Sequence, residues 1–77
     1  MDRIEVVQVL TEVLQRRGVG FAERLKLAED TEMDSYDLVG VILEMEELMD
    51  VAFDDDTQML FGEAPLSKIC DRLSSLK

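Results

Sequence analysis

The sequence of 77 residues contains no histidine, no tryptophan and a single cysteine, Cys70. Without histidine, the usual nucleophile–base pairs of hydrolytic enzymes cannot be assembled. One cysteine allows no disulfide within the chain and no cysteine metal cluster, which fits a reducing compartment, and we expect a cytoplasmic protein. Cys70 falls on the apolar face of the last expected helix, where a buried small hydrophobe is favoured over a reactive thiol. We therefore predict a protein that is not an enzyme.

Basic residues and long apolar runs are also scarce. The chain has 8 Lys and Arg against 18 Asp and Glu, a net charge of −10. No basic stripe offsets this charge, so the surface would repel a phosphate backbone, and no nucleic-acid partner is expected. The first ten residues lack a signal-peptide apolar segment, and no run of about 18 apolar residues occurs, so no membrane span is expected. The acidic surface would instead attract proteins with Lys/Arg patches.

The acidic run Asp54-Asp55-Asp56 suggests a metal site at first sight. A calcium loop of the EF-hand type needs Gly at its sixth position and Glu at its twelfth. Counted from Asp54, these positions hold Met59 and Pro65. The run is therefore interpreted as the solvated cap of a short helical turn, and no metal site is predicted.

Apolar residues at helical spacing predict an all-α bundle of three main helices and one short one. A single domain over residues 1–77 is expected, and it is expected to be a monomer. Residues 18–33 form a long connection whose apolar side chains Phe21, Leu25 and Leu27 reach the core. The predicted elements are a first helix over residues 2–17 ended by Gly18 and Gly20, a second from Asp34 or Ser35, a short turn over 58–61, and a last helix from about Leu66.

The apolar stripes of these helices predict which side chains face the core. In the first helix they are Ile4, Val7, Leu10 and Leu14, widened by Val6, Val9 and Val13. In the second they are Leu38, Val41, Ile42, Met45 and Met49, and in the last Leu66, Ile69, Leu73 and Leu76 with Cys70 beside them. Met59 is also expected to be a core methionine.

Asp34 and Ser35 admit two interpretations. Asp34 can accept hydrogen bonds from the amides of the first helical turn, and Asp37 adds a favourable negative charge there. Asp and Ser start helices very commonly, so the local pattern alone favours a simple helix start. Ser35, however, would be exposed where the partial positive charge and free amides of the helix favour a phosphate group on its hydroxyl. The residues alone leave both interpretations open.

The outer face of this helix mixes acids with exposed apolar groups. By position it carries Tyr36, Gly40, Leu43, Glu44 and Glu47. Gly40 should cost about 1 kcal/mol of helix stability relative to Ala. Either glycine at position 40 allows the close approach of a partner, or it serves no function there.

The stretch Met33-Asp34-Ser35-Tyr36-Asp37-Leu38-Val39, followed by Ile42, Glu46 and Glu47, resembles the acyl carrier protein family, which includes peptidyl and D-alanyl carriers. The resemblance covers essentially the whole chain and implies an acyl-carrier-like four-helix bundle. It implies that a phosphopantetheinyl transferase attaches 4′-phosphopantetheine from coenzyme A to Ser35, beside Asp34. The thiol of this arm would hold acyl intermediates as thioesters.

The resemblance also implies the partners. They would be an acyl-loading ligase or acyltransferase, and synthase or transferase enzymes whose basic patches dock on Tyr36, Leu43, Glu44 and Glu47. The pathway would be a fatty-acid, polyketide-type or other specialised biosynthesis. An aminoacyl or peptidyl carrier is an alternative. A carrier-fold acidic adaptor without the modification is another, because Thr31-Glu32 stands where the family commonly has Leu-Gly.

Overall fold

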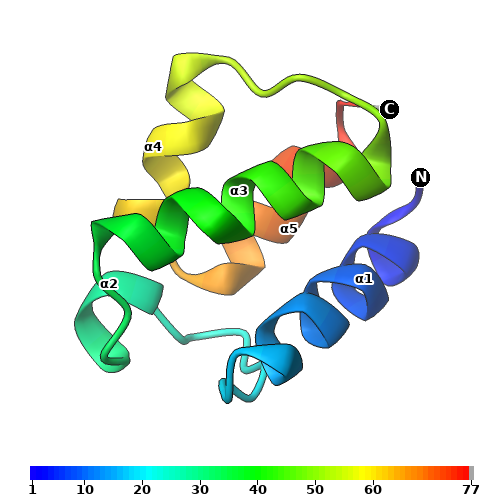
Figure 1. The fold of residues 1–77 in the computed structure, drawn as a ribbon. Helices are drawn as coiled ribbons and strands as arrows, with labels where there is room; N and C mark the ends of the chain where they lie inside the picture. Colours follow the sequence, from blue (N-terminus) through cyan, green and yellow to red (C-terminus); the bar gives the residue numbers. More distant parts are fainter. Residues whose placement is uncertain (77) are drawn as a thin grey trace.

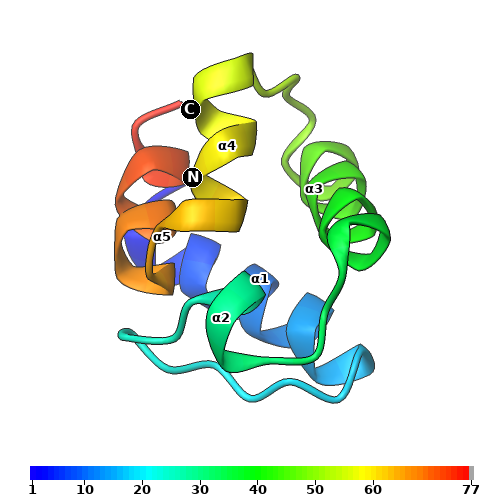
Figure 2. The ribbon, with the colours of Figure 1, turned by 90° about the vertical axis from the view of Figure 1, so that its left-hand side faces the viewer.

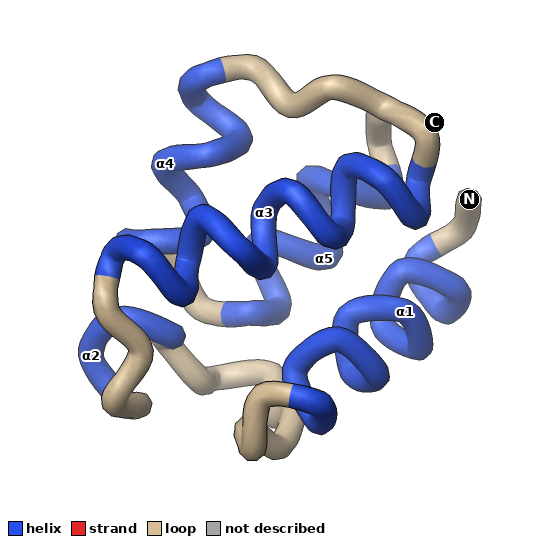
Figure 3. Tube along the Cα trace, in the orientation of Figure 1, coloured by secondary structure: helices blue, strands red, loops and turns tan. Residues whose placement is uncertain are grey.

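The computed structural model describes residues 1–76, and its regular structure in this range consists of five helices and no strand. This confirms the predicted all-α fold (Figures 1 and 3). The helices are α1 (Arg3–Arg16), α2 (Leu27–Asp30), α3 (Ser35–Met49), α4 (Asp55–Glu63) and α5 (Leu66–Ser74).

The helices enclose one hydrophobic core. α1 packs against α3 and α5, and α4 packs against α2, α3 and α5 (Figures 1 and 2). Phe53 and Phe61 stack in this core with their ring centroids 5.9 Å apart. The buried apolar residues are Val6, Leu10, Val13, Leu14, Leu27, Val41, Met45, Met49, Phe53, Phe61, Ala64, Leu66, Ile69, Cys70 and Leu73.

Most predicted core positions are confirmed, and two are wrong. Ile4 is 70% exposed and Met59 is 55% exposed. The buried face of α1 runs through Val6, Leu10 and Val13, at i, i+4 and i+7. Ile4 lies roughly 150° around the helix from the middle of that face, because each residue advances a helix by about 100°. Met59 therefore provides no interior methionine for an acyl chain.

One helix is longer than expected and one was not expected, so the prediction of three main helices and one short one is corrected. α4 begins at Asp55 rather than near residue 58 because the Asp54 carboxylate accepts a hydrogen bond from the Thr57 amide at 2.8 Å. α2 forms one turn within the predicted connection, where the Asp30 carboxylate accepts a hydrogen bond from the Lys26 amide at 2.8 Å. Capping thus creates regular structure that hydrophobic spacing does not reveal.

The segment between α1 and α2 is fixed at both ends. Gly18 has a φ of +79°, and the Val19 amide donates to the Leu14 carbonyl at 2.9 Å, which ends α1 in a Schellman motif. Further along, the Glu23 carbonyl accepts a hydrogen bond from the Ser67 amide at 3.0 Å. The Leu25 carbonyl likewise accepts from the Leu66 amide, at 2.9 Å. These bonds satisfy the first amides of α5, which has no side-chain cap.

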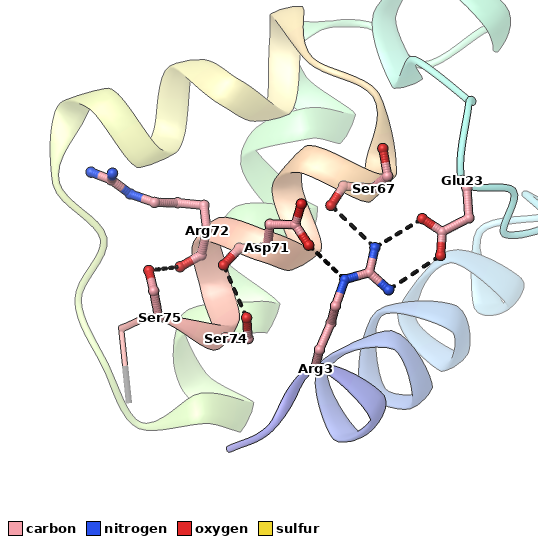
Figure 4. A network of polar contacts seen from close by, with 7 residues as sticks. All are labelled: Arg3, Glu23, Ser67, Asp71, Arg72, Ser74 and Ser75. Carbon is pink, nitrogen blue, oxygen red and sulfur yellow. Dashed lines mark hydrogen bonds and ion pairs between the residues drawn. The ribbon is translucent and has the colours of Figure 1, made fainter.

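Arg3 ties the same segment to two helices (Figure 4). Its guanidinium lies 2.9 Å from the Glu23 carboxylate and 2.6 Å from the Asp71 carboxylate on α5. It also donates a hydrogen bond to the Ser67 carbonyl at 3.4 Å. Hydrogen bonds to the two carboxylates raise the pKa of Arg3 further above its usual value. Arg3 thereby joins the segment between α1 and α2 to α5.

Candidate functional site

Asp34 and Asp37 together start α3. The Asp34 carboxylate accepts a hydrogen bond from the Asp37 amide at 2.9 Å, and the Asp37 carboxylate accepts one from the Asp34 amide at 3.3 Å. This reciprocal capping box satisfies two amides that a helix N-terminus leaves without partners. The helix start is therefore complete without the Ser35 side chain.

Ser35 is the first residue of α3 and is exposed. Its hydroxyl has no hydrogen-bond partner among residues 1–76. It stands at the end of a 15-residue helix where the helix dipole places partial positive charge. The hydroxyl is thus free to accept an added group without breaking any contact of the folded chain.

Thr31 orders the backbone that leads to this serine. Its hydroxyl donates to the Leu27 carbonyl at 2.5 Å and accepts a hydrogen bond from the Met33 amide at 3.1 Å. The side chain therefore ends α2 and sets the path of the next residues toward Asp34. Thr31 thus has a structural role within the chain, whereas Glu32 is exposed.

An open cleft of about 600 Å³ lies near the start of α3, and we call it the Ser35 cleft, although Ser35 itself does not line it. Two of its residues, Met33 and Asp37, flank Ser35 two positions away on either side. Its walls come from the end of α1, the following segment and the turn before α3. They are Arg17, Gly18, Val19, Gly20, Leu25, Asp30, Thr31, Glu32, Met33 and Asp37. The cleft combines charged groups with apolar side chains that pack against the core.

Arg17, which lines the cleft, forms an ion pair with Glu44. Arg17 Nη2 lies 3.0 Å from Glu44 Oε1, and Arg16 Nη2 lies 2.7 Å from Glu44 Oε2. A Cβ atom added at Gly40 would lie 2.9 Å from Arg17 Nη2, closer than such atoms approach one another. Gly40 therefore leaves room for an arginine of this chain, which hydrophobic spacing within α3 does not reveal. Glu44, predicted to face partners, forms ion pairs with Arg16 and Arg17 of the same chain.

The outer face of α3 carries an apolar stripe that starts beside Ser35. We define the α3 stripe as Tyr36, Val39, Leu43 and Glu47. The three apolar members are 86%, 52% and 59% exposed, respectively. Glu47 is exposed and has no ion-pair partner among residues 1–76. Val39 was missed as a member of this face, although its spacing from Tyr36 and Leu43 places it there.

Other features of residues 1–76 bear on the chemistry. Burial raises the pKa of the Cys70 thiol to about 11, so little thiolate is present at neutral pH. No group of three or more His, Cys, Asp or Glu side chains in this range can hold a metal ion. No helix of these residues has the length and apolar character that crossing a membrane requires.

Comparisons of the chain with protein-family models, with curated proteins and with solved structures give no match. The function must therefore be inferred from the residues of this chain and their geometry.

Proposed function

We propose that the chain is a free-standing acyl carrier protein modified at Ser35. The observation that carries this proposal is the exposed Ser35 hydroxyl, which begins α3 yet takes no part in its capping box. The order of helices adds support, because the long α3 follows a long connection that contains only the single turn of α2, and Asp-Ser stands at its start. The acyl-carrier-like version of the helical bundle is part of the same proposal.

The surroundings of Ser35 fit a phosphate group. The N-terminus of a helix stabilises a nearby negative charge by about 0.3–1 kcal/mol. The Asp34 and Asp37 carboxylates would oppose this charge, but each is engaged by a backbone amide, at 2.9 and 3.3 Å. The open surface and the adjoining cleft leave space for the rest of a phosphopantetheine arm. When bound, that group supplies a thiol to which an acyl group can be attached.

The modification requires one bond to form and one to break. The Ser35 Oγ bonds to the phosphorus that carries pantetheine in coenzyme A, and the pyrophosphate P–O bond breaks. Adenosine 3′,5′-bisphosphate leaves with the electron pair, and the hydroxyl proton passes to a base of the transferase. An exposed serine suits this reaction, since a second protein must reach it. The chain itself supplies the nucleophile and the position, while the transferase supplies the catalysis.

The α3 stripe is proposed as the docking surface for the partner enzymes. Its apolar members would be buried by a complementary groove, and Glu47 would meet Lys or Arg at the rim of that groove. The net charge of −10 would speed the encounter with such basic surfaces. Glu44 contributes less to this attraction because Arg16 and Arg17 already neutralise it. The cytoplasmic location and monomeric state remain part of the proposal.

A second candidate is an acidic adaptor that docks through the same stripe without being modified. The complete capping box favours it, because Asp34 and Asp37 explain the helix start without any role for Ser35. An aminoacyl or peptidyl carrier would differ from an acyl carrier only in its cargo.

Modification at Ser35 tests the proposal directly. The folded protein is incubated with coenzyme A and a broad-specificity phosphopantetheinyl transferase, digested, and its peptides are sequenced by mass spectrometry. We expect the group on the peptide that contains Ser35. A folded protein whose peptides all stay unmodified would favour the adaptor.

A further inference from the structure

We propose that the Ser35 cleft is the binding place of the pantetheine arm, which rests on the proposed function. The cleft lies beside the attachment point, because Met33 and Asp37 in its wall flank Ser35 in the chain. A volume of about 600 Å³ is within the range of small-molecule sites, roughly 300–1,000 Å³. An arm anchored at Ser35 would enter the cleft at high effective concentration, so weak contacts would suffice to hold it.

Beside the carboxylates of Asp30, Glu32 and Asp37, the lining offers apolar surface and hydrogen-bond donors to a chain of amides and methyl groups. Val19, Leu25 and Met33 are partly buried against the core, so they offer apolar surface in fixed positions. Arg17, the C-cap of α1, also lines the cleft, and its guanidinium, which pairs with Glu44, has further N–H donors. The hydroxyl of Thr31 already makes two hydrogen bonds, so it shapes the wall rather than binding a ligand.

Two glycines are related to the cleft: Gly20 lines it, and Gly40 lies against Arg17, which lines it. Gly40 has no Cβ, and this absence leaves room for the Arg17 guanidinium in the wall. Gly20 lines the cleft, but neither a left-handed φ nor a close neighbour requires glycine there, because an added Cβ would meet nothing within 4 Å.

Gly20 therefore provides the test variant. Gly20→Leu would add a side chain to the cleft lining, and its Cβ would meet no atom of the protein within 4 Å. Gly62→Leu is the matched control, since an added Cβ at Gly62, which is exposed on α4 outside the cleft, also meets nothing within 4 Å. Circular dichroism checks that both variants fold.

Two measurements locate the arm without relying on cargo transfer. First, the amide NMR signals of the protein are compared before and after modification by the transferase. We expect shifts at residues 17–20 and 31–33 in addition to those next to Ser35. Second, the reaction of the arm thiol with a disulfide reagent is timed, with unmodified protein as the blank for Cys70. We expect a several-fold faster reaction in Gly20→Leu than in Gly62→Leu or the unchanged chain.

The outcomes separate the two proposals. Modified protein whose shifts stop at residues 34–38, with equal thiol rates in the three chains, would overturn the cleft as the arm's binding place and leave the carrier function standing. If the folded chain takes up no group at all, the carrier function fails, and the inference fails with it.

Discussion

The Arg17 guanidinium lies against Gly40, with Nη2 at 2.9 Å from the place where a Cβ would stand. This contact joins the end of α1 to the middle of α3, and Glu44 holds the guanidinium there at 3.0 Å. The glycine in the middle of a helix thus has an explanation inside the molecule. It also links the α3 surface to one wall of the Ser35 cleft.

Gly40→Ala tests this contact. Alanine should stabilise the interior of α3 by roughly 0.5–1 kcal/mol relative to glycine. The clash falls on the flexible end of Arg17, whose exposed ion pair contributes about 0–1 kcal/mol. We expect a net gain of a few tenths of a kcal/mol in the unchanged chain and a larger gain in an Arg17→Ala background. Urea denaturation of the four proteins measures both gains, and equal gains would show that Arg17 does not contact residue 40.

Arg3→Lys should loosen the segment between α1 and α2. Lysine cannot bridge Glu23 and Asp71 in the way that the planar guanidinium does. We expect faster hydrogen exchange at the Leu66 and Ser67 amides, which donate to carbonyls of that segment. Arg24→Lys serves as the control, because Arg24 is exposed and makes no ion pair among residues 1–76. Unchanged exchange at both amides in Arg3→Lys would mean that the network does not hold the segment.

Asp54→Asn should remove part of the pH dependence of stability. Hydrogen bonds from Thr57, with the Arg72 charge, hold the pKa of Asp54 below its ordinary value of 3.8. A carboxyl whose pKa is lowered by folding stabilises the protein above its unfolded pKa, and this contribution is lost as pH falls through the folded pKa. Asparagine is also a good N-cap, so the comparison isolates the charge. The unfolding midpoints of the two proteins should differ at neutral pH and converge in acid; a constant difference would refute the assignment.

The α3 stripe should affect binding and not folding. Tyr36→Ser and Leu43→Ser change exposed side chains, so each should alter unfolding free energy by no more than about 0.5 kcal/mol. Binding to the transferase, measured by calorimetry, should weaken in both and in Glu47→Lys, the last with a smaller salt dependence. Glu44→Gln should have less effect than Glu47→Lys. Met59→Ser on α4 is the control, and a loss of affinity there equal to that of Leu43→Ser would place docking elsewhere.

Local patterns predicted the helices and most of the core, because burial repeats along a helix with a fixed period. Capping residues located Asp34 and Ser35 at the start of α3, because Asp side chains accept hydrogen bonds from the first amides of a helix. The local patterns missed α2, since its one turn depends on side-chain bonds from Asp30 and Thr31 rather than on apolar spacing. They could not explain Gly40, because its neighbour Arg17 is 23 positions away in the chain. Contacts of this kind become visible only when the helices are packed.

The intact mass of the folded chain after incubation with coenzyme A and a broad-specificity phosphopantetheinyl transferase tests the central claim most directly. A gain of one phosphopantetheinyl group is predicted for the unchanged protein and for Ser75→Ala, which removes another exposed hydroxyl. No gain is predicted for Ser35→Ala, which should fold normally because the Asp34–Asp37 capping box remains. An unchanged mass of the folded protein, or a gain that survives in Ser35→Ala, would contradict the assignment of Ser35 as the attachment site.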